Sequence, residues 1–242
     1  MAEIAVPYEY DGRKFEGMLV YDDCVTEKRP AIFMQPDWLG VCPHMIGMAR
    51  EAAGPDYVML VADMYGVGYG EREQTNDELL ASATGVRGDL PLILGCGAKA
   101  HEALTSAANE RGLIDPGKTG AIGYCMGGGF ALEQARAGAD FKATVVFHVT
   151  APNPVDPDAK ADFKGRVLAL HGSTDPVTPK PMMDALEAEL TGAEVDWQIM
   201  TFGRGTHSFC VPGANNPPVQ VYDEELCKKS YRMMRDFFAE TF

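Results

Sequence analysis

Residues 123–127 place a cysteine midway between two glycines, in the order Gly-Tyr-Cys-Met-Gly. The segment follows a short apolar run and precedes a helical pattern, so it predicts a sharp strand-to-helix turn. Such a turn lifts Cys125 above the sheet edge at a helix N-terminus, where the dipole and free amides favour thiolate over thiol. The backbone amide of Met126 then points to where a tetrahedral oxyanion would form. The sequence thus predicts a nucleophile at Cys125, with a buried structural cysteine as the alternative.

Candidates for the acid and the base follow on two later strand-end loops. Asp175 lies in a polar turn after the strand Val167–His171, and His207 lies in a glycine-containing loop after the strand Val195–Phe202. A catalytic triad on a strand–helix sheet has the order nucleophile, acid, base, and these residues follow it. Asp175 before a proline is also typical of a turn, and a loop histidine is often only solvated. The combination of types, places and order favours a Cys125–Asp175–His207 triad.

The remaining histidines and the cysteines show no metal-ligand spacing, so we expect neither a metal nor a cofactor. The six cysteines include no CxxC pair. Since the N-terminus has neither a basic segment nor an apolar stretch of the kind a secretion signal carries, we expect a cytoplasmic protein with reduced cysteines.

Apolar runs alternate between strand and helix patterns along the 242 residues. A hairpin is predicted at Glu3–Tyr8 and Lys14–Tyr21, turning at Asp11-Gly12. The expected later strands are Pro30–Met34, Tyr57–Asp63, Thr119–Gly123, Ala143–Phe147, Val167–His171 and Val195–Phe202. The expected helices are Met45–Ala53, Glu71–Ala83, Asp89–Arg111, Gly127–Ala137, Lys180–Leu190 and Asp223–Phe238, and Thr150–Ala161 is expected to be a loop. This alternation predicts an α/β fold with a mostly parallel central sheet flanked by helices on both faces, in one domain spanning 1–242.

Acidic residues outnumber basic ones 35 to 21, a formal net charge of −14. Such a surface repels phosphate backbones and anionic lipids, so we expect neither nucleic-acid nor membrane partners. An anionic substrate would need a locally placed arginine to overcome this field.

With these residues in place, the chain resembles the dienelactone hydrolase family, which has the α/β-hydrolase fold. The resemblance rests on Gly123–Gly128, His171–Pro176 and Thr206–Phe209 and extends from the Pro30–Gly40 strand and loop to the last helix. It implies that the amide of Trp38 is the second oxyanion donor beside Met126. Family members often carry a glutamate that interacts with the resting thiol, and Asp37, a shorter carboxylate, stands at that position here.

The resemblance also implies arginines that hold a substrate carboxylate, one of them four residues after the histidine. That position is Val211 here, which is a departure from the pattern. Arg204 could substitute for it, and Arg72 loosely resembles the setting of the other arginine; either residue could equally be a surface residue. The departure at Val211 therefore argues against dienelactone itself as the substrate.

The expected function is hydrolysis of a small-molecule carboxylic ester or lactone through an acyl-enzyme, by a monomer or small homo-oligomer. A thiolate attacks esters well but amides poorly, because it leaves more readily than an unprotonated amine. Two alternatives remain open: a thiol redox or sensing protein built on Cys125, and a non-catalytic binding module on the same fold.

Overall fold

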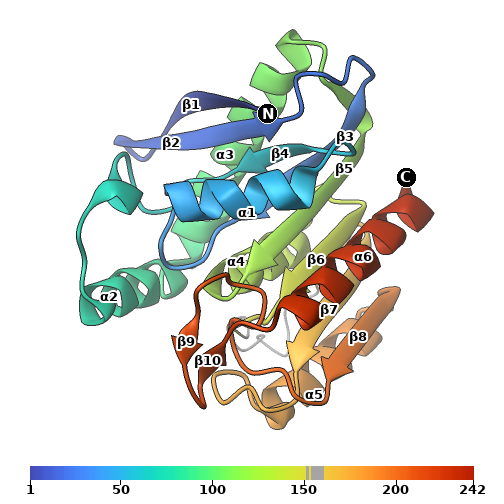
Figure 1. The fold of residues 1–242 in the computed structure, drawn as a ribbon. Helices are drawn as coiled ribbons and strands as arrows, with labels where there is room; N and C mark the ends of the chain where they lie inside the picture. Colours follow the sequence, from blue (N-terminus) through green and yellow to red (C-terminus); the bar gives the residue numbers. More distant parts are fainter. Residues whose placement is uncertain (151–152, 154–160) are drawn as a thin grey trace. The chain divides into compact units, whose positions relative to one another are not determined.

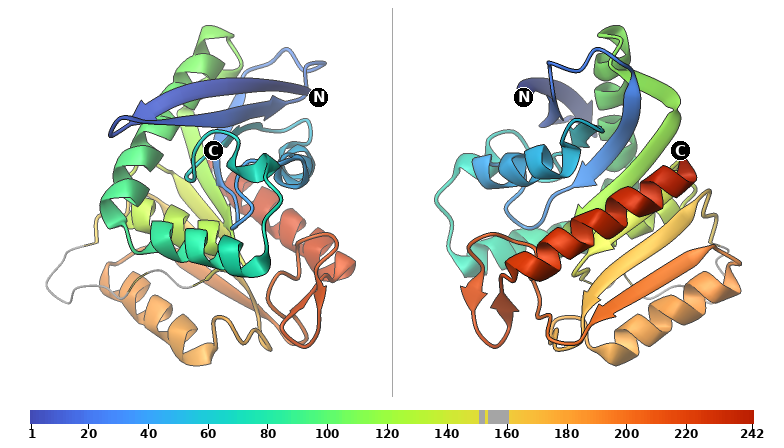
Figure 2. Two further views of the ribbon diagram at one scale, coloured as in Figure 1. Left: turned by 90° about the vertical axis from the view of Figure 1, so that its left-hand side faces the viewer. Right: turned by 45° about the vertical axis from the view of Figure 1, so that its right-hand side comes forward.

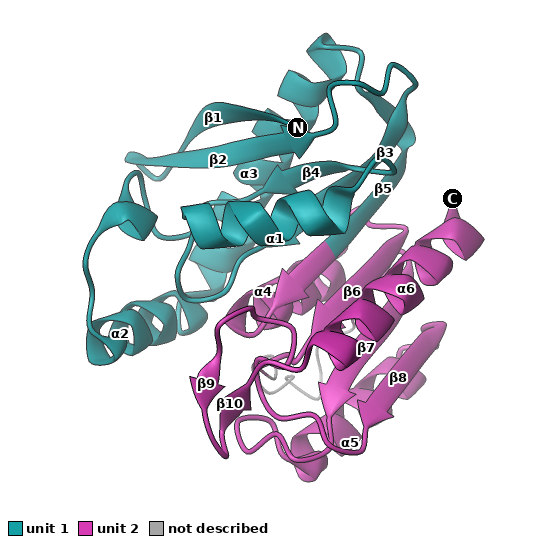
Figure 3. Ribbon diagram, in the orientation of Figure 1, with its two compact units in different colours: residues 1–121 teal, residues 122–242 magenta. Residues whose placement is uncertain are grey.

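The computed structural model describes residues 1–150, 153 and 161–242. The chain forms two compact units, Met1–Ala121 and Ile122–Phe242 (Figure 3). Strand β5 (Ile114–Tyr124) belongs in part to each of them. The predicted single domain stays a prediction, and most of the predicted loop at Thr150–Ala161 lies outside the described residues.

The first unit begins with the hairpin that the sequence predicts. Strands β1 (Ala2–Tyr10) and β2 (Arg13–Tyr21) pair antiparallel, and Asp11 and Gly12 both adopt positive φ angles, of 48° and 71°. A two-residue turn of this kind matches the right-handed twist of its strands. The strand order is β1-β2-β4-β3-β5, with β3 (Arg29–Gln35) and β4 (Val58–Val61) parallel to each other.

Helices cover both sides of these strands (Figures 1 and 2). Helix α1 (Pro43–Ala53) packs on β2 and β4, and α3 (Leu90–Glu110) packs on β1 and β2. The helix predicted at Glu71–Ala83 is wrong in its bounds: a short 3₁₀ turn, η1, covers Tyr69–Glu71, and α2 covers Asn76–Arg87. The reason is a capping box, in which the Thr75 side chain accepts from the Glu78 amide while the Glu78 carboxylate accepts from the Thr75 amide.

The second unit continues the parallel arrangement. The order is β5-β6-β7-β8, with β6 (Ala143–Phe147), β7 (Arg166–Gly172) and β8 (Trp197–Phe202) parallel to one another. The helices are α4 (Met126–Arg136), α5 (Lys180–Gly192) and α6 (Glu224–Thr241). A small hairpin, β9 (Asn215–Asn216) and β10 (Gln220–Val221), was not predicted from the sequence.

Neighbouring residues of β6 point to opposite faces of the sheet. Val146 packs in a cluster with Leu132 of α4 and Leu186 of α5, whereas Phe147 contacts Tyr231 of α6. Helices α4 and α5 therefore cover one face and α6 the other, as the views in Figure 2 also show. This confirms the predicted mostly parallel sheet with helices on both faces. Among the described residues, no helix has the length and apolar character needed to span a membrane.

The expectation that every cysteine is reduced is wrong for two of the six. Cys210, in the loop after His207, and Cys227, in α6, form a disulfide across 17 residues, and both are buried. The backbone brings them together, since the Asp223 amide at the start of α6 donates to the Phe209 carbonyl. The other cysteines, including Cys125, are not in disulfides.

Candidate active site

Cys125 is the residue at which β5 turns into α4, as predicted. Its backbone has φ 53° and ψ −120°, a strained conformation that a non-glycine residue rarely adopts. The flanking glycines permit the turn, because a Cβ at Gly123 would lie 2.4 Å from the Gly127 carbonyl oxygen. The Gly128 amide closes the turn by donating to the Cys125 carbonyl at 3.1 Å. The sulfur is thus presented at the first turn of α4.

The three predicted site residues meet in the second unit. His207 Nδ1 lies 2.8 Å from Asp175 Oδ2, and His207 Nε2 lies 3.0 Å from Cys125 Sγ. Asp175 and His207 are both buried, at 4% and 1% exposure, so solvent does not compete for these hydrogen bonds. The structure thereby joins three residues that the sequence places far apart.

Backbone contacts fix the acid and the base in these positions. The other oxygen of Asp175, Oδ1, accepts from the amides of Val177 at 2.8 Å and Thr178 at 3.1 Å. This leaves Oδ2 directed at the imidazole. The His207 amide donates to the Val219 carbonyl, next to a bridge between His207 and Gln220. The small β9–β10 hairpin therefore anchors the loop that carries the base.

The two partners of His207 decide its protonation. Burial alone lowers its pKa, but the Cys125 sulfur and the Asp175 carboxylate outweigh burial and raise the pKa to about 10. The two partners thereby favour the charged form of the ring, in which one N–H is donated to the carboxylate and the other to the sulfur. Such a ring is already charged to protonate a leaving group.

Two further buried histidines stand near this ring. His148 is fully buried, its ring lies edge-on to His207 with centroids 5.4 Å apart, and neither of its nitrogens has a hydrogen-bond partner among the described residues. Burial lowers the pKa values of His148 and His171, and the charge of His207 lowers both further. The pKa shifts of both rings therefore favour the neutral form.

Sequence reasoning missed the segment after β6. It singled out neither His148, which has a positive φ of 37°, nor Thr150, whose Oγ1 lies 3.5 Å from Cys125 Sγ. A signal was present, because both follow the carboxyl end of a parallel strand, where sites form in such sheets.

A largely buried ion-pair network joins α4 and α5 in the second unit. Arg136 of α4 pairs with Glu133 of the same helix and with Glu189 of α5, each at 2.6 Å. Burial would lower the pKa of Arg136, but the two carboxylates outweigh it and raise the pKa. Glu133 also accepts from the Asn153 amide at 2.8 Å, so α4 holds the backbone at that residue.

The other predicted residues are placed as follows. Met126 is the first residue of α4, and an amide there has no acceptor within its helix. Asp37 and Trp38 belong to the first unit, where Asp37 is buried and its Oδ1 accepts from the Leu39 amide at 2.8 Å, and the Trp38 carbonyl accepts from the Tyr69 hydroxyl at 3.2 Å. Their roles at the thiol and at the oxyanion stay predictions.

The predicted substrate-binding arginines lie in different units. Arg204, in the second unit, is 71% exposed and its Nε lies 3.2 Å from Asp223 Oδ2. Arg72 is an exposed residue at the end of the 3₁₀ turn in the first unit. Their part in substrate binding stays a prediction.

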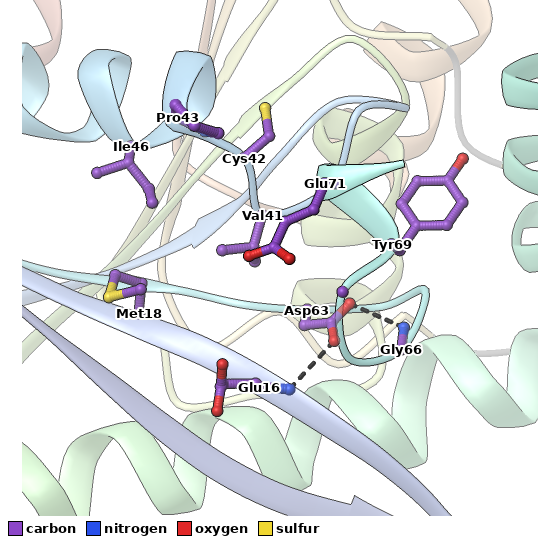
Figure 4. A pocket seen from close by; sticks show the side chains of 12 residues that line it. Glu16, Met18, Val41, Cys42, Pro43, Ile46, Asp63, Gly66, Tyr69 and Glu71 are labelled. Atoms are coloured by element: carbon purple, nitrogen blue, oxygen red, sulfur yellow. Dashed lines mark hydrogen bonds between the residues drawn. The ribbon is translucent and has the colours of Figure 1, made fainter. Parts of the chain in front are cut away.

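The first unit has a pocket of its own, a cavity of about 150 Å³ between β2, the start of α1 and the 3₁₀ turn (Figure 4). The buried Asp63 is one of the residues that line this pocket. The carboxylate of Asp63 accepts hydrogen bonds from the amides of Glu16, Tyr65 and Gly66. That carboxylate therefore supports the backbone of this unit.

In the described part of the chain, one group of three potential metal ligands has all of its ligand atoms close to one another. Asp22, Asp23 and Cys24 place their ligand atoms within 4.8 Å of one another in a partly exposed turn. Asp23 already pairs there with the N-terminal ammonium of Met1 at 2.9 Å.

Comparisons with known proteins agree with this geometry. The dienelactone hydrolase family matches residues 15–242. The chain belongs to the dienelactone hydrolase family. It is 31% identical to the solved structure named "m3DLH", with a TM-score of 0.89, covering 100% of this chain and 98% of that one.

A second solved structure is the dienelactone hydrolase-like promiscuous phosphotriesterase P91 from metagenomic libraries. It is 28% identical, with a TM-score of 0.87, and the match covers 100% of this chain and 98% of that one. An uncharacterised protein of Caenorhabditis elegans is 31% identical over 146 residues, 58% of this chain and 91% of that protein. These matches show the α/β-hydrolase fold and a dienelactone hydrolase-like hydrolase.

Proposed function

We propose that this chain hydrolyses small carboxylic esters or lactones through an acyl-enzyme on Cys125. The observation that carries the proposal is the unbroken line of contacts from Asp175 Oδ2 through both nitrogens of His207 to Cys125 Sγ, with distances of 2.8 and 3.0 Å. Carboxylate, imidazolium and sulfur in this order form a charged nucleophile with a proton donor beside it.

In the first half of the reaction, the sulfur of Cys125 attacks the carbonyl carbon and forms a C–S bond. The amide of Met126, with that of Trp38 as the second donor, holds the oxyanion. When the intermediate collapses, the C–O bond to the leaving group breaks and the Nε2 proton of His207 passes to the departing alkoxide. Asp175 keeps the imidazole oriented throughout.

In the second half, His207 is neutral at Nε2 and accepts a proton from water. The water oxygen bonds to the acyl carbon, and the C–S bond breaks with its electron pair returning to sulfur. The carboxylic acid product leaves, and the thiolate–imidazolium pair is restored. An amide substrate would fail in the first half, because the thiolate is expelled from the intermediate more readily than an unprotonated amine.

Uncharged esters suit the chain better than carboxylated lactones. Val211 occupies the position at which the family resemblance implies an arginine, and Arg204 is paired with Asp223. The net charge of −14 also opposes an anionic substrate. We therefore expect an aryl acetate to be a better substrate than dienelactone.

The redox alternative finds less support in the second unit. Its cysteines are Cys125, Cys210 and Cys227, and the last two are joined to each other. Neither is a free thiol that could resolve an oxidised Cys125. A redox role would also leave the Asp175–His207 pair without a purpose.

The test is the rate of hydrolysis of 4-nitrophenyl acetate and of a dienelactone by the parent, by Cys125→Ala and by Cys24→Ala. Cys24 is an exposed free thiol and serves as the matched control. We expect turnover by the parent and the control only, with the acetate preferred. Equal rates in the parent and Cys125→Ala would refute the proposal, and peroxide oxidation of Cys125 would then be measured for the redox alternative.

A further inference from the structure

Two polar side chains of the second unit contact the sulfur of Cys125 in the described part of the chain. One is His207, at 3.0 Å, and the other is Thr150, whose Oγ1 lies at 3.5 Å, within hydrogen-bond distance of a sulfur atom. The steps proposed above use His207 and leave the hydroxyl of Thr150 without a role.

The backbone holds Thr150 firmly against the nucleophile. The Thr150 amide donates to the Cys125 carbonyl at 2.9 Å, and the Cys125 amide donates to the Phe147 carbonyl at 3.1 Å. The turn between Phe147 and Thr150 is fixed in turn by the His148 amide, which donates to the Leu170 carbonyl. Thr150 is 7% exposed and β-branched, so its side chain has few rotamers available. The hydroxyl is therefore positioned by the elbow itself.

The charge of the neighbouring ring sets the direction of the Thr150–Cys125 hydrogen bond. Cys125 and Asp175 raise the pKa of His207 against the effect of burial, which favours its imidazolium form. In the thiolate–imidazolium pair of the proposed function, Nε2 donates its proton to the sulfur, which accepts as a thiolate. The hydroxyl of Thr150 must then donate as well, and a hydrogen bond to a charged acceptor is stronger than one between neutral groups.

We propose that Thr150 is a catalytic residue whose hydroxyl is the second hydrogen-bond donor to the Cys125 thiolate. The inference rests on the proposed function and adds a residue to it. The donor stabilises sulfur in the resting enzyme and again in deacylation, when the C–S bond breaks and its electron pair returns to sulfur. In the intervening acyl-enzyme the sulfur is uncharged, so the hydroxyl contributes least there.

The direct test is alkylation of Cys125 by iodoacetamide as a function of pH, followed by mass spectrometry of the peptide that carries it. Thr150→Val removes the hydroxyl at nearly constant shape, and Thr150→Ser keeps it. We expect the pH of half-maximal rate to rise by about one unit in the valine variant. Below that pH the fraction of thiolate falls, but each remaining thiolate is slightly more nucleophilic, so the rate should fall by about fourfold. The serine variant should alkylate like the parent.

Other titratable groups around the pair do not change in this comparison. Asp175, His148 and His171 are the ones described near it in the second unit, and they are the same in every variant. Thr144→Val is the matched control, since Thr144 is a buried residue of β6. It should leave the alkylation profile unchanged, whereas a general loosening of the strand would shift it too.

A parent-like profile in Thr150→Val would overturn the inference. If that variant does not fold, Thr150→Ala against Thr150→Ser gives the same comparison. Alkylation needs no substrate, so the profile can shift even if the parent hydrolyses no ester, and in that case only the proposed function fails. If the parent hydrolyses the aryl acetate, kcat should fall about tenfold in Thr150→Val without a rise in KM, because expulsion of sulfur from the second intermediate is slowed.

Discussion

Replacing Cys125 by alanine should lower the pKa of His207 by several units while leaving its position intact. In the parent, burial lowers that pKa, and the sulfur and Asp175 together raise it to about 10. The variant keeps the burial and the carboxylate 2.8 Å away but loses the sulfur. Burial, which disfavours the imidazolium, is then opposed by Asp175 alone, so the pKa of His207 falls.

The expected size of the change follows from the distance between the charges. His207 Nε2 and Cys125 Sγ are 3.0 Å apart. At an effective dielectric constant of about 20, two unit charges at that distance interact by roughly 5 kcal/mol, which corresponds to about four pKa units. An interaction of this size is as large as the net rise from the ordinary value of 6.5 to about 10, to which Asp175 also contributes and which burial opposes. We therefore expect a pKa close to 6.5 in Cys125→Ala.

Histidine-labelled protein allows the measurement by ¹H–¹⁵N correlation of the ring nitrogens between pH 5 and 11. The chain has five histidines, and His207→Gln identifies the relevant signal. In the control variant Cys24→Ala, which lacks an exposed cysteine far from the triad in sequence, His207 should titrate as it does in the parent. An unchanged His207 midpoint in Cys125→Ala would refute the reasoning, because the sulfur would then carry no charge beside the ring.

Three further outcomes follow from the second unit. Asp175→Asn should lower ester turnover by about 10²–10⁴-fold with little change in KM, since the imidazolium loses its carboxylate; parent-like kcat in steady-state assays would contradict this role. Gly123→Ala should lower the free energy of unfolding by about 1–3 kcal/mol in urea titrations, because its Cβ would lie 2.4 Å from a carbonyl oxygen, whereas Gly203→Ala, with no atom within 4 Å of its Cβ, should change it little. Replacing Cys210 and Cys227 together by serine should cost about 3 kcal/mol, the loop-closure value for a 17-residue separation, and reductant should then cause no further loss of stability in the variant.

The elbow at Cys125 could be predicted because its determinants are local. The glycines that allow the turn lie two residues to either side of Cys125, and the strand and helix that define it are its direct neighbours in the chain. Asp175 and His207 could be predicted for a related reason. Each follows a recognisable apolar strand, and parallel strands end at one edge of a sheet.

The error in α2 shows where local patterns mislead. The acidic and polar residues from Glu71 onward suit a helix in composition, yet the helix begins at Asn76. The reciprocal hydrogen bonds between Thr75 and Glu78 decide the start. A capping-box pattern was present in the sequence, and it decides the start of the helix despite the favourable helix propensity of the residues before it.

What the sequence determined by itself was the alternation of elements, the turn that presents Cys125 and the order of the triad residues. Only the tertiary structure decided which groups surround the sulfur and the imidazole. Thr150 contacts Cys125, which lies 25 residues earlier in the sequence. His148 follows a different strand from His207, yet the two rings pack together. Cys210 forms a disulfide with Cys227 because α6 packs beside the loop that carries His207. These contacts depend on the register and direction of strands and helices that are distant in the chain. No local propensity encodes that register, since it is fixed by the packing of the core as a whole.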